Sequence, residues 1–184
     1  MSFSGIVLNG GSSTRMGRDK SEIFYKGRRL LDIAIDSLLA ADAYDVVIVG
    51  GVTKFNFTGE RVTYCEDLFP NEGPLGGVIT GLKSVKSDIA MILACDYLDV
   101  DRSLILECIS KLDSRSMVFP VYEGKDQYLF SAIRVDTLHE LELQFMKGVR
   151  SIHKATANLD CQSYESSSSG KLRSANTPSQ LNED

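Results

Sequence analysis

The sequence predicts an α/β sandwich with a mostly parallel sheet, and three observations support this fold class. Short apolar runs typical of buried strands alternate with longer stretches whose apolar residues recur at helical spacing. Several of the apolar runs stop at turn-forming residues such as glycine and aspartate. The run 89–94 is almost entirely apolar, as expected of a central strand covered on both faces. Such alternation is typical of helices packed on a parallel sheet.

The first half of the chain begins with a short buried-strand pattern that ends at the turn Asn9-Gly10-Gly11. Leu31, Ile35 and Leu38 then recur at helical spacing. In order, the patterns predict a strand, a helix, two strands, a Gly/Pro-rich loop and a helix. Their ranges are 5–8, about 29–41, 46–49, 62–65, 71–77 and 78–85.

After the central strand, a helix is predicted to start near Asp101, whose carboxylate suits a helix N-terminus. Two strands follow at 117–122 and 128–135, with a turn between them at 123–126, and Asp136-Thr137 is a further helix start. The tract 166–170 contains four serines and a glycine, and we expect it to be a flexible surface loop rather than a linker. Residues 1–184 are therefore predicted to form a single domain.

Composition excludes several functional classes. The chain has 184 residues, with 20 Lys and Arg against 25 Asp and Glu and a net charge of −5. A nucleic-acid-binding domain is normally basic, so no nucleic-acid partner is expected. No apolar run approaches the roughly 18 residues that cross a bilayer, and the N-terminus lacks an export signal, so no membrane partner is expected. Four scattered cysteines are typical of a reduced, cytoplasmic protein.

The most informative segment is the loop after the first strand, residues 8–20. It combines two adjacent glycines, three hydroxyl residues and the cations Arg15, Arg18 and Lys20. Consecutive loop amides form an anion-binding concavity, so this composition favours a polyphosphate ligand. The loop is not a Walker A motif, because Arg18 follows Gly17, and it lacks the Gly-x-Gly-x-x-Gly dinucleotide fingerprint. A P-loop hydrolase and an NAD-binding domain are therefore disfavoured.

The loop resembles the signature Leu-x-Gly-Gly-x-Ser-x-Arg-Met-Gly-x-Asp-Lys of the molybdenum cofactor guanylyltransferases, the MobA family of nucleotidyltransferases. The match begins at Leu8 and ends at Lys20, and Asn9 stands where the family usually has a small apolar residue. Three later segments resemble further family motifs in the same order. They are Glu66-Asp67-Leu68 with Gly73-Pro74-Leu75-Gly76-Gly77, then Ala94-Cys95-Asp96, then Asn176-Thr177-Pro178.

The resemblance implies a Rossmann-like three-layer α/β/α sandwich of the nucleotide-diphospho-sugar transferase type. It implies transfer of GMP from GTP to the molybdenum cofactor, with pyrophosphate released and molybdopterin guanine dinucleotide formed. Arg15, Lys20 and Asp96 would then be the catalytic residues. GTP would contact Leu8, Asn9, Gly10, Gly11, Lys20, Asp67 and Asp96. The pocket wall and acceptor side would include Gly73, Pro74, Leu75, Gly76 and Asn176.

Asp96 is also the expected ligand of a Mg²⁺ cofactor, because a hard carboxylate at the end of a central strand suits that ion. The alternative for Asp96 is a helix cap, and the alternative for Asp67 is a turn carboxylate before Pro70. Expected partners are GTP and the molybdenum cofactor, with transient contacts to cofactor-delivery proteins and molybdoenzymes.

Three other functions stay open at this point. They are a CTP-dependent cytidylyltransferase for the same cofactor, a sugar- or polyol-phosphate nucleotidyltransferase, and a nucleotide-binding relative without activity.

Overall fold

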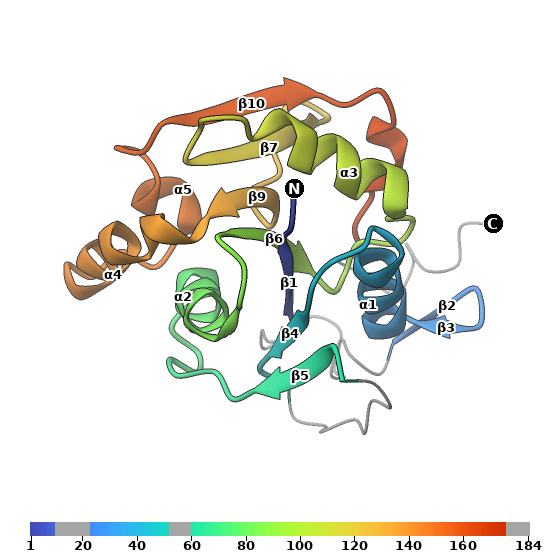
Figure 1. Cartoon of the computed structure of the whole chain (residues 1–184), viewed down its shortest axis with the longest axis horizontal. Coiled ribbons are helices and arrows are strands. Elements are labelled where there is room, and N and C mark those ends of the chain that lie inside the picture. The colour runs from blue at the N-terminus through green and yellow to red at the C-terminus, as the bar shows by residue number, and fades with distance from the viewer. Residues whose placement is uncertain (10–22, 52–59, 176–184) are drawn as a thin grey trace.

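The computed structural model describes residues 1–9, 23–51 and 60–175 of the chain, and a mixed eight-stranded sheet lies at its centre (Figure 1). The strand order is β10-β7-β9-β6-β1-β4-β5, with β8 paired to β7. The four strands β5, β4, β1 and β6 are mutually parallel, and β9 runs antiparallel to both β6 and β7. The strands are β1 (Ser4–Leu8), β4 (Val46–Val49), β5 (Val62–Cys65), β6 (Ile89–Ala94), β7 (Met117–Tyr122), β8 (Lys125–Asp126), β9 (Phe130–Arg134) and β10 (Cys161–Glu165).

Helices cover both faces of this sheet, which confirms the predicted three-layer α/β/α sandwich (Figure 1). One face carries α1 (Leu30–Ala40) and α3 (Arg102–Lys111), and the other carries α2 (Pro74–Ser84), α4 (Leu138–Met146) and α5 (Ile152–Ala155). The described part of the chain also contains the 3₁₀ turns η2 (Val135–Thr137) and η3 (Ser169–Leu172) and a separate hairpin of β2 (Phe24–Tyr25) and β3 (Arg28–Arg29). Among the described residues, no helix is long and apolar enough to span a membrane.

Alternation along β1 shows why the sheet is buried on both sides. Val7 belongs to the apolar cluster beneath α1 and α3, whereas Ile6 and Leu8 belong to the cluster beneath α2, α4 and α5. Successive side chains of a strand point to opposite faces, so a continuous apolar run builds two cores at once. The same reasoning explains the wholly buried β4 and β6.

Helix α2 begins at Pro74, so the prediction that residues 71–77 form a loop and that the helix starts at Val78 is wrong. Proline is favoured at the first helical position, where its missing N–H costs nothing. Gly77 and Gly81 lie one turn apart on the side of α2 that faces β1. A Cβ atom at position 81 would sit 2.5 Å from Cγ2 of Ile6. The glycines inside the helix therefore allow it to pack closely on the sheet.

Most other elements lie where the sequence predicts them, including the strands at 46–49, 62–65, 89–94 and 117–122. Asp101 caps α3 as predicted, accepting a hydrogen bond from the Leu104 N–H at 3.1 Å. The hairpin β2–β3, helix α5 and strand β10 were not predicted. The serine tract, for which the sequence predicts a flexible surface loop, packs on α3 and leads into η3.

Candidate functional site

The candidate site lies at the carboxyl ends of β6, β1, β4 and β5, which end together at one edge of the sheet. The chain passes from β1 to β4 and β5 on one side, and then returns to β6 on the other side of β1. Ligands of open α/β sheets bind at such a reversal of strand order. Backbone hydrogen bonds join the strand ends, from Asn9 N to Val49 O at 2.9 Å and from Cys95 N to Leu8 O at 3.2 Å.

Leu8 and Asn9 lie at the reversal itself, and both are buried. The Asn9 side chain is 3% exposed and donates from Nδ2 to the Gly50 carbonyl at 3.4 Å. Its Oδ1 atom is buried and has no hydrogen-bond partner within the part of the chain that the structure describes. A buried acceptor without a donor is rare, and it costs about 1–3 kcal/mol. The candidate residues Gly10, Gly11, Arg15, Lys20 and Asn176 lie outside the described residues.

Asp67 follows β5 and is partly buried at the same edge. Its Oδ1 accepts the backbone N–H of Phe69 at 2.9 Å, and the Thr80 hydroxyl lies 3.2 Å from the same atom. Asp67 thus closes a turn and ties it to α2, which is the alternative that the sequence left open for this residue. The second oxygen, Oδ2, makes neither contact.

The segment Gly73–Gly76 forms the entry to α2, at the carboxyl edge of the sheet. Gly73 adopts a φ of +83°, and a Cβ there would lie 3.0 Å from the Arg150 carbonyl. Both features favour glycine at this position. Gly76 packs against Phe69, where an added Cβ would lie 2.8 Å from the Phe69 Cβ. Packing alone therefore accounts for glycine at 73 and 76, and their contact with a nucleotide stays a prediction.

Asp96 follows β6 and lines a pocket of about 310 Å³. The pocket is also lined by Asp126 and Tyr128 from the β8–β9 region, by Gln127 and by Ser174 near the described end of the chain. The sequence reasoning did not identify these pocket residues, because they come from segments far apart in the chain. Aromatic and amide side chains in the turn after residue 124 were the available signal.

The phenols beside Asp96 remain protonated at neutral pH. Burial and the nearby charge of Asp96 raise the pKa of Tyr97 well above its ordinary value. Burial, with the hydrogen bond to Asp126, raises the pKa of Tyr128 to about 12. The Tyr97 hydroxyl donates to Oε1 of Gln127 at 3.1 Å, and the Tyr128 hydroxyl donates to Oδ2 of Asp126 at 3.0 Å. These bonds orient Gln127 and Asp126 along the pocket.

Mg²⁺ fits the carboxylates of this pocket. Among the described residues, no group of three His, Cys, Asp or Glu side chains could hold a metal ion unaided. Mg²⁺ commonly binds through one or two carboxylates together with substrate phosphates and water. Asp96 and Asp126 line the same pocket, so they offer hard oxygen ligands of the kind the ion prefers.

The chain is similar in sequence to known proteins of one family. Residues 5–160 match the family model described as the MobA-like NTP transferase domain. A molybdenum cofactor guanylyltransferase of Pseudomonas entomophila is 34% identical over 157 residues, covering 82% of this chain and 80% of that one. A second one, from Pseudomonas putida, is 31% identical and covers 96% of this chain and 94% of its own.

Solved structures show the same fold. The molybdopterin-guanine dinucleotide biosynthesis protein A of Archaeoglobus fulgidus superposes with a TM-score of 0.74 at 19% identity, covering 97% of this chain and 94% of that one. The 2-C-methyl-D-erythritol 4-phosphate cytidylyltransferase of Thermus thermophilus superposes with a TM-score of 0.76 at 14% identity, covering 98% and 96%.

Proposed function

This chain belongs to the MobA-like NTP transferase family, and from that premise we propose that it transfers GMP from GTP to the molybdenum cofactor. The supporting observation is that Asn9, Asp67 and Asp96 follow three strands that end at one edge of the sheet, with Asn9 and Asp96 after the two strands at which the strand order reverses. The two relatives described above, named guanylyltransferases, favour GTP over the CTP-dependent and sugar-phosphate alternatives. A carboxylate at position 96, after a strand at the strand-order reversal, favours an active enzyme over an inactive relative.

The chemical step is a displacement at the α-phosphorus of GTP. An oxygen of the acceptor's terminal phosphate forms a bond to that phosphorus, while the bond from phosphorus to the bridging oxygen breaks. Pyrophosphate leaves with the electron pair, and the product is molybdopterin guanine dinucleotide. Two anions must approach each other, so positive charge and oriented donors are needed before and during the step.

The nucleotide side of the site is proposed to extend along β1, β4 and β5. Leu8 and Asn9 would contact the base, and the buried Oδ1 of Asn9 would gain a donor there. Asp67 would contact the nucleotide through Oδ2, because its Oδ1 accepts the Phe69 N–H. The cations Arg15 and Lys20 would contact the triphosphate. The backbone amides of the loop glycines Gly10 and Gly11 would bind its phosphate oxygens.

The acceptor side is proposed to be the pocket beyond Asp96. Its volume of about 310 Å³ lies at the low end of ligand pockets, so it suits part of the acceptor rather than all of it. The protonated hydroxyl of Tyr128 and the amide of Gln127 line this pocket together with Asp96, so the pocket presents polar groups to an acceptor. Asn176 follows the described Ala175 directly and would belong to this side.

Asp96 would hold Mg²⁺, assisted by Asp126 across the pocket. When bound, the ion neutralises charge on the triphosphate oxygens. The protein would hold the Asp96 carboxylate between the nucleotide and the acceptor. We also propose a cytoplasmic location and transient contacts with cofactor-delivery proteins and molybdoenzymes.

The test is product formation by purified protein with the molybdenum cofactor, Mg²⁺ and either GTP or CTP. Pyrophosphate release and the guanine dinucleotide, seen by mass spectrometry with GTP only, are expected. Turnover with CTP instead would assign the chain to the cytidylyl branch. Turnover of GTP with a sugar phosphate and none with the molybdenum cofactor would contradict the proposed acceptor.

A further inference from the structure

Residues 166–175, here called the strap, connect the end of β10 to the loop that follows β6, and their first residues are fixed on α3. The Ser166 hydroxyl donates to Oε2 of Glu107 at 2.7 Å, and the Ser167 N–H donates to Oε1 at 3.2 Å. Ser166 is buried even though it opens a tract of four serines. The Ser167 hydroxyl also donates to Oε1 at 3.4 Å, so Glu107 receives three donors from two residues that lie 59 and 60 positions later in the chain.

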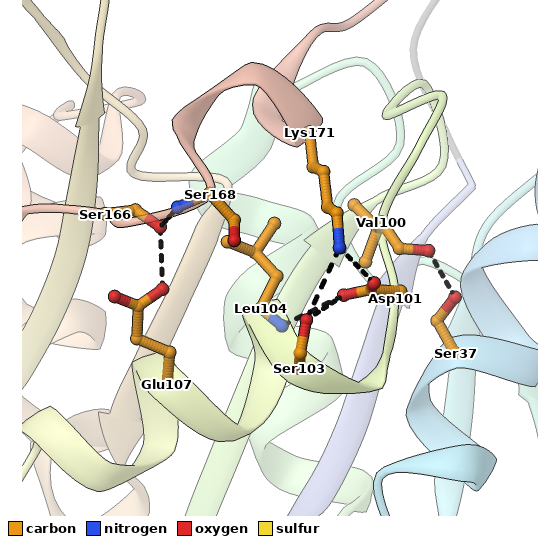
Figure 2. Close-up of polar contacts among 9 residues, drawn as sticks. All are labelled: Ser37, Val100, Asp101, Ser103, Leu104, Glu107, Ser166, Ser168 and Lys171. Atoms are coloured by element: carbon orange, nitrogen blue, oxygen red, sulfur yellow. Dashed lines mark hydrogen bonds and ion pairs between the residues drawn. The ribbon is translucent and has the colours of Figure 1, made fainter.

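A second anchor lies one turn further along the strap, at the N-terminus of α3 (Figure 2). Lys171 in η3 donates to Asp101, and its Nζ lies 3.5 Å from the Ser103 hydroxyl. The adjacent Leu172 is 1% exposed and joins the apolar cluster under α1 and α3. Figure 2 shows the two anchors on α3, with Ser166 directed at Glu107 and Lys171 directed at Asp101. The strap is thus fixed at two places before it reaches the site.

Beyond the anchors, the strap pairs with the backbone that carries Asp96. The Ala175 N–H donates to the Asp96 carbonyl at 2.8 Å, and the Leu98 N–H donates to the Arg173 carbonyl at 3.0 Å. Tyr97 and Ser174 form an antiparallel bridge between these bonds. The strap, which lies near the C-terminal end of the described chain, therefore holds the backbone of Asp96, and the strap is in turn held by α3.

Arg173 extends this connection to the β2–β3 hairpin. Its Nη2 donates to the Tyr25 hydroxyl at 2.9 Å and to Oδ2 of Asp99 at 3.4 Å. Tyr25 lies in the β2–β3 hairpin, which follows the signature loop 8–20 in the chain. Leu98, Ala175 and Tyr25 also share a small buried cluster. One segment therefore touches both the Asp96 loop and the hairpin.

We propose that Lys171 and Glu107 are positioning residues, which hold the strap so that Asp96 stays in register with the nucleotide. This inference rests on the proposed function, because that function assigns Asp96 to the reacting phosphates. The Lys171–Asp101 pair is about 40% exposed, and exposed pairs contribute little to stability. Displacing a reacting group by about 1 Å can cost about 100-fold in rate. The Lys171 anchor is therefore expected to affect turnover more than folding.

The experiment compares two double variants. Lys171→Met/Glu107→Ala removes both anchors and leaves Asp101 in place, since Asp101 also caps α3. The matched control, Lys83→Met/Asp160→Ala, breaks two other surface pairs, Lys83–Glu142 and Arg115–Asp160. Lys83 is 40% exposed, as is Lys171. Lys171→Arg keeps the pair and should behave as wild type. The single variants Lys171→Met and Lys83→Met repeat the comparison with a smaller perturbation.

Two quantities are measured for each variant. Hydrogen exchange followed by mass spectrometry reports on the amides of Leu98 and Ala175, which bond across the strap. Steady-state kinetics give kcat with GTP and the molybdenum cofactor, and the Mg²⁺ concentration at half-maximal rate. We expect faster exchange at both amides, a kcat lowered about tenfold and a raised Mg²⁺ requirement in the anchor variant, with none of these in the control.

Unchanged hydrogen exchange at Leu98 and Ala175 in the anchor variant would refute the claim that Lys171 and Glu107 hold the strap in place. Faster exchange with kcat and Mg²⁺ dependence equal to the control would overturn its positioning role. Wild-type turnover is measured first, so absence of GMP transfer there contradicts the proposed function, and the exchange data still decide whether the anchors hold the Asp96 loop.

Discussion

Two substitutions at Asp67 separate its part in the turn from its proposed contact with GTP. Oδ1 of this carboxylate accepts the Phe69 N–H at 2.9 Å, and the Thr80 hydroxyl lies 3.2 Å from it. Asp67→Asn keeps an oxygen acceptor and removes the negative charge. Asp67→Ala removes both the acceptor and the charge. Both variants therefore lose the negative charge, but only Asp67→Ala also loses the acceptor that closes the turn.

The expected magnitudes follow from these contacts. Asp67→Ala leaves a backbone donor of the partly buried Phe69 unpaired, which costs about 1 kcal/mol, at the low end for a lost buried partner. In a chain of 184 residues, that loss lowers the Tm by about 2–4 °C. Asp67→Asn should lower the Tm by less than about 2 °C. A hydrogen bond to a charged group is worth about 1.5–3 kcal/mol, so both variants should raise the KM for GTP about tenfold or more.

Thermal unfolding and initial-rate kinetics on the same preparations test both statements. Equal Tm values for the Ala and Asn variants would refute the role of Oδ1 in the turn. A wild-type KM for GTP in both variants would refute the nucleotide contact and leave Asp67 as a turn residue only.

Three further predictions concern stability and ligand binding. Asn9→Ala should weaken GTP binding about tenfold in a calorimetric titration. It should change the free energy of unfolding by less than about 1 kcal/mol, because the loss of the Nδ2 hydrogen bond to Gly50 is offset by removal of an Oδ1 atom that has no partner among the described residues. Gly81→Val should destabilise the fold by about 1–3 kcal/mol in urea, because its Cβ would lie 2.5 Å from Ile6 Cγ2. Burial alone would raise the pKa of Asp101, but hydrogen bonds from Lys171, Ser103 and the Leu104 N–H lower it below its ordinary value of 3.8. That carboxylate therefore stabilises the fold above pH 3.8 and loses this contribution as the pH falls toward its folded-state pKa, so Lys171→Met should unfold at a higher pH in an acid titration.

Each of the three has a clear contrary result. Unchanged GTP affinity in Asn9→Ala would remove this side chain from the nucleotide site. A Gly81→Val variant as stable as wild type would show that α2 does not need its close approach to β1. Coincident acid unfolding curves for wild type and Lys171→Met would show that the ion pair does not perturb Asp101.

The sequence predicted the sheet well because its inner strands are continuous apolar runs. The inner strands at 46–49 and 89–94 have the predicted bounds, since their pattern is local and strong. The edge strand at 62–65 also has its predicted bounds, although it is only half-buried. Strand β10 escaped prediction because most of its residues are polar and it pairs only with β7 on one side. Helix α2 was placed four residues late, because glycines that serve helix–sheet packing resemble a loop in sequence.

The candidate site likewise contains residues whose place the sequence predicts and residues whose place it does not. The place of Asn9, Asp67 and Asp96 at the carboxyl edge of the sheet was predictable, because each lies just after a strand and parallel strands bring their carboxyl ends together. Their contact with a nucleotide stays a prediction. The other residues of the Asp96 pocket were not predictable. Gln127, Tyr128 and Ser174 come to that pocket through antiparallel pairing and the strap, and both depend on contacts between distant segments. A tract of four serines has no local feature that indicates Glu107 as its partner.

The role of Asp96 is the central claim, and one comparison tests it most directly. Pyrophosphate release from GTP is measured with the molybdenum cofactor and saturating Mg²⁺, for wild type and for Asp96→Asn, which keeps the size of the side chain. We expect the variant to fold with a Tm within about 2 °C of wild type and to lose about 100-fold or more of the rate. A variant that folds and turns over GTP at the wild-type rate would contradict the account.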